Sequence, residues 1–169
     1  MSQHATEQQL AEAGTSGVIA RPPLLFLAAL VLGFGLDHLV RLPFPVPRSG
    51  WVHWFSAANA ACLILAGIAV FAAGVRNFWH AATPVPGTKP TRALVTIGIH
   101  KWSRNPIYVG MFVIYAGIGL VVRSPWILIL AVPLAMTIHY GVVMREEAYL
   151  ERRFGDAYRD YKARVGRWL

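Results

Sequence analysis

Four long apolar runs constrain this chain more than any other feature of its sequence. They cover residues 24–40, 52–75, 106–122 and 125–144. An α-helix rises about 1.5 Å per residue, so each run is about as long as the hydrocarbon core of a bilayer is thick. Only 14% of the residues are charged, against about 25% in soluble domains. The sequence therefore predicts an all-α integral membrane protein with about four transmembrane helices.

The last two runs are separated only by a polar break at residues 123–125, which predicts a C-terminal helical hairpin. Both open ends of such a hairpin lie on the same side of the membrane. Arg104 and Asn105 come just before its first helix, and Glu146 and Glu147 come just after its second. We therefore expect these two pairs to be neighbours at the membrane surface.

The residues before the third run are suited to an anion-binding helix start. Asn105 is a favourable N-cap and Pro106 a favourable first helical residue. The free N–H groups of the first turn and the charge of Arg104 attract an anion, and Tyr108 can stack on a ligand or donate to it. The carboxylates at the other end can accept from hydroxyls or bind an ammonium group. Together they would suit a zwitterionic amino-acid moiety with a ribose, but an interfacial charge next to an ordinary helix cap explains the residue types equally well.

A longer pattern covers residues 92–169, a little under half of the chain. It consists of Leu94-Val95-Thr96-Ile97-Gly98-Ile99-His100, Trp102-Ser103-Arg104-Asn105-Pro106-Ile107-Tyr108-Val109-Gly110, Glu146-Glu147-Ala148-Tyr149-Leu150, Phe154-Gly155-Asp156-Ala157-Tyr158, Tyr161 and Arg167-Trp168. In the order and spacing of these motifs the chain resembles the isoprenylcysteine carboxyl methyltransferases and their relatives among the phospholipid methyltransferases. It departs from them at Asn105, where many members have His, and at His100, where Tyr is common. Compared with His, Asn105 still provides a helix-capping side chain but has no titratable group. Compared with Tyr, His100 still provides a flat polar ring.

The resemblance implies that S-adenosylmethionine is the methyl donor. No metal is expected, because the sulphonium already activates the methyl group. The cofactor contacts implied by the matching positions are Leu94, Val95, His100, Asn105, Pro106, Tyr108 and Glu146, with backbone contacts from Ile107. Glu147 joins this set because of its charge and its place in the motif. Arg104 and Tyr108 are also expected to meet the reactive head of the acceptor.

His139 lies within the last apolar run and is the candidate base if the acceptor is an amine. At α-helical spacing it shares a face with Val143 and Glu146. A histidine inside a membrane segment can also be a satisfied core residue, and this alternative stays open.

The ends of the chain differ from its middle. Residues 1–20 are small and polar and are predicted to be a disordered tail, which leaves residues 21–169 as a single membrane domain. Residues 145–169 carry aromatic side chains at helical spacing with basic residues between them. This pattern predicts a cytoplasmic amphipathic C-terminal helix that lies on the membrane surface.

Positive charge predicts the orientation. Of the 16 Lys and Arg residues, 13 fall on one side of a four-span arrangement and 3 on the other. The positive-inside rule then places both termini and the candidate site in the cytoplasm, as in a bacterial inner-membrane protein. Membrane lipids are the expected partners of the basic residues, and the apolar runs argue against nucleic acid.

The predicted function is methyl transfer to a lipophilic acceptor at the membrane interface. A lipidic or isoprenoid-type carboxylate is favoured, because Arg104 and a helix N-terminus attract an anion and a carboxylate needs no base. The acceptor would be a lipophilic small molecule or a lipid-modified substrate. The alternatives are a phospholipid amine, a small hydrophobic thiol, an NADPH-dependent sterol-reductase-like protein and a non-catalytic membrane scaffold. The oligomeric state is not predicted.

Overall fold

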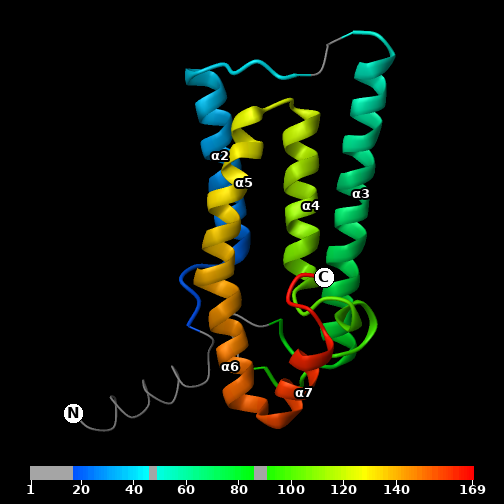
Figure 1. The fold of residues 1–169 in the computed structure, drawn as a ribbon, viewed down its shortest axis with the longest axis vertical. Helices are drawn as coiled ribbons and strands as arrows, with labels where there is room; N and C mark the ends of the chain where they lie inside the picture. The colour runs from blue at the N-terminus through cyan, green and yellow to red at the C-terminus, as the bar shows by residue number, and fades with distance from the viewer. Residues whose placement is uncertain (1–16, 46–48, 86–90) are drawn as a thin grey trace, which may run out of the picture. The chain divides into compact units, whose positions relative to one another are not determined.

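A computed structural model describes residues 17–45, 49–85 and 91–169 (Figure 1). The regular structure within these ranges is helical, with no β-strand. The elements are α2 (Pro22–Leu39), α3 (Trp51–His80), the 3-10 helix η1 (Gly98–Lys101), α4 (Pro106–Val121), α5 (Pro125–Ile138), the π-helix η2 (His139–Val143), α6 (Met144–Phe154) and α7 (Asp156–Arg164). The predicted all-α fold class is therefore confirmed.

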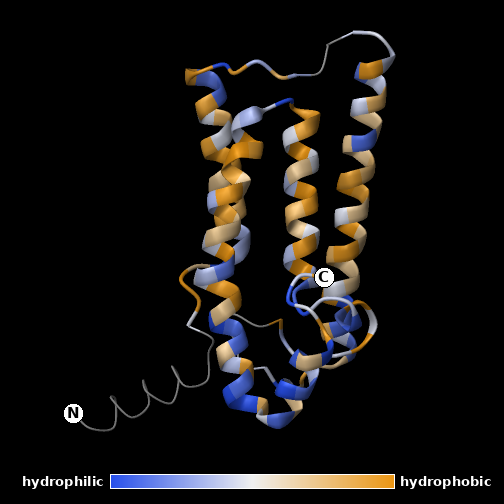
Figure 2. Ribbon diagram, in the orientation of Figure 1, coloured by the Kyte–Doolittle hydropathy of each residue, from blue (hydrophilic) through white to orange (hydrophobic). Residues whose placement is uncertain are grey.

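Three helices in the described part are long and apolar enough to cross a membrane. They are Pro22–Leu39, Trp51–His80 and the continuous helix Pro125–Phe154, which comprises α5, η2 and α6. Hydrophobic residues dominate α2, α4 and α5, and hydrophilic residues dominate α6 and α7 (Figure 2). Helix α4 is equally apolar but has only 16 residues, so the fourth span stays a prediction.

The chain forms two compact units. The apolar unit comprises Pro22–Ala72 and Pro106–Met136, and the polar unit comprises Met1–Arg21, Ala73–Asn105 and Thr137–Leu169. The boundaries between them fall within α3, within α5 and at the start of α4. Of the predicted site residues, those of the first turn of α4 thus belong to the apolar unit and the others to the polar unit.

Glycine allows close contact between α3 and α4 in the apolar unit. A Cβ added at Gly110 would lie 2.7 Å from Phe71 N and 2.8 Å from Gly67 O. Because both neighbours are backbone atoms, they cannot move aside as a flexible side chain could, and a side chain at position 110 would clash with α3. Gly33 of α2 makes a similar approach to α5, where an added Cβ would lie 3.2 Å from Ile127 Cα. Small residues are typical where helices pack inside lipid.

The turn between α4 and α5 forms at the predicted break. Arg123 has a φ of 59°, and Ser124 N donates to Gly119 O at 2.9 Å. Ser124 Oγ accepts from Ile127 N at 3.0 Å and so caps the start of α5. Helix α5 begins at Pro125, a residue that suits the first helical position.

Tyrosines join the segments of the polar unit. Thr91 N donates to the Tyr149 hydroxyl at 3.1 Å, and the Tyr161 hydroxyl donates to His100 O at 2.7 Å. Tyr158 and Tyr161 of α7 are both buried. The exposed side of α7 carries Arg159, Lys162 and Arg164. The aromatic side of α7 is thus used within the unit, and the predicted binding of residues 145–169 to a membrane surface stays a prediction.

The described part of the predicted N-terminal tail, residues 17–20, packs on η2. Ile19 N donates to Gly141 O at 3.3 Å, and Arg145 Nη1 donates to Gly17 O at 2.9 Å. Residues 1–16 of that tail lie outside the described residues.

Candidate functional site

Glu147 lies at the centre of a buried charged cluster in the polar unit. Its Oε1 is 3.1 Å from Arg104 Nη1, and it accepts from Arg167 Nε and Nη2 at 3.0 and 2.9 Å through its two oxygens. The side chains of Glu147 and Arg104 are only 8% and 9% exposed. Hydrogen bonds to Glu147 raise the pKa of Arg167, so both guanidinium groups are charged. One carboxylate therefore faces two cations, and the cluster has a net positive charge.

The C-terminal segment, residues 166–168, runs back along the loop before α4. Arg104 N donates to Gly166 O at 3.0 Å, and Asn105 Nδ2 donates to Arg167 O at 3.0 Å. Ser103 Oγ accepts from Asn105 N at 3.1 Å and orders the loop itself. Two predicted site residues are thus tied to the C-terminal segment through its backbone carbonyls.

His139 reaches the same cluster from η2. Its Nε2 lies 3.3 Å from Arg167 Nη1, and its ring lies 6.0 Å from that of Trp168 at an interplanar angle of 31°. Arg167 therefore contacts both His139 and Glu147 along one helix.

The π-helix explains how these two residues share a face. The sequence predicts that His139 and Glu146 lie on one face of the helix. That prediction assumes uninterrupted α-helical geometry over seven residues. A π-turn contains an additional residue, so with η2 in between about eight residues complete two turns. Glu147, eight residues after His139, thereby comes onto the side that Arg167 contacts. π-Turns inside long helices are frequent at functional sites.

His100 of η1 is a buried neutral group, with 3% of its surface exposed. Asn77 Nδ2 donates to Ile97 O at 2.8 Å and lies 3.2 Å from His100 Nδ1. Burial lowers the pKa of His100 to about 4. At neutral pH its Nδ1 therefore accepts from Asn77, and the proton is on Nε2, where it can be donated.

Tyr158 of α7 also borders the charged cluster. Burial and, next, the charge of Glu147 raise the pKa of its phenol to about 12, although Arg104 lowers it in part. Burial likewise raises the pKa of Tyr161. Both phenols are therefore protonated at neutral pH.

The structure brings some predicted site residues together and leaves others apart. Arg104, Asn105, His139 and Glu147 form one connected set with the C-terminal segment. The polar unit also contains His100, half-buried Leu94 and buried Val95 and Glu146. Pro106, Ile107 and Tyr108 form the first turn of α4 in the apolar unit.

Arg167 is the residue of the charged cluster that was not predicted from the sequence. The Arg167-Trp168 pair belongs to the motif pattern, which was the only signal for it. No spacing along the chain connects Arg167 with His139 or Glu147, because their contact depends on the return of the C-terminal segment.

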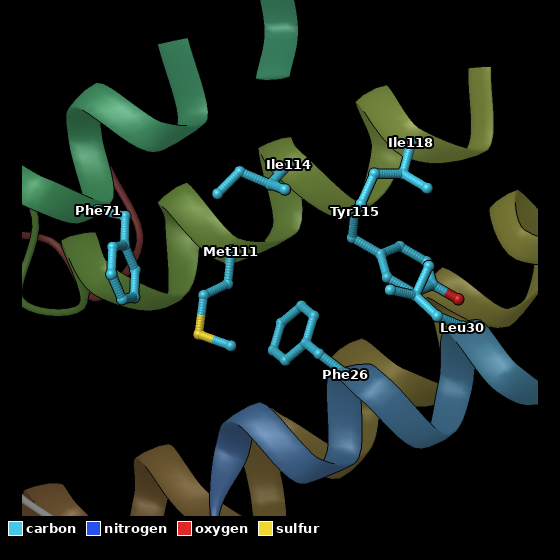
Figure 3. Close-up of a pocket in the computed structure, with 7 residues that line it drawn as sticks. All are labelled: Phe26, Leu30, Phe71, Met111, Ile114, Tyr115 and Ile118. Atoms are coloured by element: carbon cyan, nitrogen blue, oxygen red, sulfur yellow. The ribbon is translucent and has the colours of Figure 1, made fainter. Parts of the chain in front are cut away.

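The apolar unit contains a pocket of about 240 Å³ (Figure 3). Its lining consists of Phe26 and Leu30 of α2, Phe71 of α3, and Met111, Ile114, Tyr115 and Ile118 of α4. The Phe26 and Tyr115 rings meet edge to face with centroids 6.0 Å apart. The Tyr115 hydroxyl is buried and has no hydrogen-bond partner within the described ranges. The pocket is thus suited to an apolar chain.

Comparisons with known proteins agree with the motif pattern. A family model described as phospholipid methyltransferase matches residues 55–157, which is more than half of the chain. The protein-S-isoprenylcysteine O-methyltransferase of Rattus norvegicus is 31% identical over 164 residues, or 87% of this chain and 56% of the relative. The human protein of that name is 29% identical over the same coverage. That of Saccharomyces cerevisiae is 27% identical over 120 residues, or 66% of this chain and 50% of the relative.

The chain thus spans about half the length of these curated relatives. The apolar helices and the relatives together indicate an integral membrane protein. The resemblance predicted from the motifs is confirmed, and the chain belongs to the phospholipid methyltransferase family.

Proposed function

We propose that this chain transfers a methyl group from S-adenosylmethionine to a lipophilic acceptor at the membrane interface. Membership of a methyltransferase family supports the reaction. The name of the relatives, protein-S-isoprenylcysteine O-methyltransferase, supports an oxygen acceptor on a lipid-modified substrate. In this proposal the acceptor is a lipidic or isoprenoid-type carboxylate on a small molecule or a lipid-modified protein.

The main structural support for this proposal is a buried hydrogen-bond donor of the Arg104 side chain. Its Nε has no hydrogen-bond acceptor in the described part of the chain. Its Nη1 lies 3.1 Å from Glu147 Oε1 but is not aligned for a hydrogen bond. An unpaired buried donor costs about 1–3 kcal/mol, so an anionic group that accepts from Arg104 would bind favourably. We assign this role to the carboxylate of the acceptor.

The polar unit also offers groups that fit S-adenosylmethionine. The buried carboxylates of Glu146 and Glu147 suit an ammonium group and ribose hydroxyls, and the Nε2–H of His100 suits an acceptor atom of the nucleoside. Leu94 and Val95 provide apolar cover. The remaining proposed contacts, which come from the motif pattern alone, are Asn105, Pro106, Ile107 and Tyr108. The cofactor supplies an activated methyl group, and the chain aligns the acceptor and excludes water.

The environment of His139 favours a carboxylate over an amine as acceptor. An ammonium group must lose a proton before its nitrogen can attack, and His139 is the candidate base for that step. However, Nε2 of His139 faces a guanidinium nitrogen of Arg167 at 3.3 Å. A carboxylate attacks without losing a proton and does not need this base. A thiol or a phospholipid amine is the second candidate.

The apolar pocket is the proposed binding site for the tail of the acceptor. Each buried methylene adds about 0.8 kcal/mol, so tail length should strongly affect apparent affinity.

Cofactor binding provides the first test. The purified protein should bind radiolabelled S-adenosylmethionine and not NADPH, and Glu146→Gln should weaken that binding about tenfold or more through loss of a charge-assisted hydrogen bond. Glu151→Gln is the matched control, since Glu151 lies on the same helix but is exposed and paired with Lys162. NADPH binding would favour the reductase alternative, and binding of neither would favour a scaffold. Unchanged affinity in Glu146→Gln would remove this residue from the site.

An acceptor panel provides the second test. It comprises prenylcysteine acids, free isoprenoid acids, phosphatidylethanolamine and short water-soluble carboxylates. The tailed carboxylates should be methylated fastest and should give a base-labile ester. Equal rates on the soluble acids would contradict a role for the pocket, and a base-stable product would exclude O-methylation of a carboxylate.

A further inference from the structure

Arg167 contacts two predicted site residues, Glu147 and His139. Its Nε and Nη2 bind both oxygens of Glu147, and its Nη1 lies 3.3 Å from His139 Nε2. The three nitrogens of one guanidinium group thus contact two side chains that lie two turns apart on one helix. A lysine has a single nitrogen and cannot reproduce this fork.

These contacts define the protonation state of His139. A guanidinium group has donors but no acceptor, and Arg167 is charged, so Nε2 of His139 must accept. The imidazole is then neutral and its proton is on Nδ1. In this state neither ring nitrogen has a free lone pair.

The side chain of Arg167 is one of several attachments of the C-terminal segment. The segment is also held by the carbonyls of Gly166 and Arg167, which accept from Arg104 N and Asn105 Nδ2. Those two hydrogen bonds are available to any residue at position 167. The chain end therefore keeps these two attachments when the side chain of Arg167 is changed.

We propose that Arg167 is a positioning residue, which keeps His139 neutral with its proton on Nδ1 and keeps the Glu147 carboxylate in one orientation. Without the guanidinium group, His139 and Glu147 would be free to pair as imidazolium and carboxylate. That pair would turn the Glu147 carboxylate away from its present orientation, and the proposed function counts Glu147 among the cofactor contacts. The inference rests on the proposed function for its role in methyl transfer, but the state of His139 does not depend on it.

The state of His139 is measured by two-dimensional NMR of the detergent-solubilised full chain labelled with ¹⁵N-histidine. The chain has 6 histidines, and the His139→Gln spectrum identifies the signal of interest. In the wild type, Nδ1 of His139 should be the protonated nitrogen and Nε2 the unprotonated one. Arg167→Gln should move the proton to Nε2 or protonate both nitrogens. Arg164→Gln, a change of an exposed arginine in the same region, should leave the signal unchanged.

Two results would overturn the assignment: a wild-type His139 protonated on Nε2, or an unchanged His139 signal in Arg167→Gln. If Arg167→Gln does not fold, the wild-type spectrum and Arg167→Lys decide. The ammonium group of lysine keeps the positive charge and can donate to His139 Nε2, so Arg167→Lys should retain the Nδ1–H state at His139.

Kinetics test the positioning role. With an acceptor that is turned over, kcat of Arg167→Gln should fall about tenfold or more while KM for the acceptor changes much less, because alignment is lost and not acceptor binding. Arg167→Lys should recover part of kcat. A kcat of Arg167→Gln equal to that of wild type would overturn the role. Absence of methyl transfer to every acceptor would count against the proposed function, and the NMR result would still decide the state of His139.

Discussion

Burial keeps His100 uncharged in the folded protein. Its pKa is lowered to about 4, against about 6.5 for a histidine in an unfolded chain. Below pH 6.5 the unfolded chain therefore binds a proton that the folded protein does not bind. The free energy of unfolding is therefore higher at neutral pH, and the contribution of His100 to it is lost as the pH falls from about 6.5 to about 4.

A substitution of His100 isolates this effect. Between pH 7 and pH 4.5 the free energy of unfolding of the wild type should fall by about 2 kcal/mol more than that of His100→Gln. Glutamine can still accept from Asn77 but does not titrate. The measurement is chemical unfolding in detergent followed by circular dichroism at both pH values. Parallel losses in the two proteins would show that His100 is not the titrating group.

At the scale of elements, backbone geometry determines which helices and side chains meet. Gly110 allows α4 to approach the backbone of α3 at Phe71 and Gly67. The π-helix η2 shifts the helical phase between His139 and Glu147 by one residue. In each case a single residue makes the contact possible. Gly110 has no side chain to separate α4 from α3, and the extra residue of the π-turn brings His139 and Glu147 to the same side of the helix.

Alanine at Gly110 should separate α3 from α4. Its Cβ would meet backbone atoms of α3, so Gly110→Ala should lower the free energy of unfolding by about 1–3 kcal/mol. Gly35→Ala in α2 is the matched control, because an added Cβ there meets nothing within 4 Å. The control should be neutral or gain up to about 1 kcal/mol from helix propensity. Equal stabilities of the two variants in the same detergent would contradict the close approach.

At the scale of the whole molecule, the distribution of charge predicts the orientation of this integral membrane protein. The bias of 13 to 3 in Lys and Arg residues places both termini and the charged cluster in the cytoplasm if four helices cross the membrane. The exposed side of α7 carries three basic residues beside Asp156 and Asp160, and anionic lipids on that side of the membrane attract Lys and Arg.

Reporter fusions test this orientation and the number of spans together. In a bacterial host, reporters at Leu169 and near residue 48 should report opposite compartments, with the C-terminus cytoplasmic. The same compartment for both fusions would contradict four spans with the predicted connections. An extracytoplasmic C-terminus would contradict the orientation of the site.

Local signals in the amino-acid sequence predict the helices and most of their ends. The predicted runs 106–122 and 125–144 begin where α4 and α5 begin, because proline at the first helical position is a local signal. The last run continues beyond residue 144 to Phe154, since charged residues end the membrane-like stretch but not the helix. Motif order also identified the family. Arg104, Asn105 and Glu147 belong to one connected set of residues, and their role in a functional site stays a prediction.

Contacts between distant segments of the chain hold the charged cluster together, and these contacts could not be predicted. Arg167 lies 20 residues from Glu147 in the chain, and no periodicity connects residues on separate segments. The same holds for Asn77, which is 23 residues from His100 and selects the tautomer of its ring. The π-helix was not predicted either, because its extra residue has no signature in the hydrophobic pattern. Local preferences decide where a helix starts and stops, whereas the partner of a buried charge depends on which segments return to it.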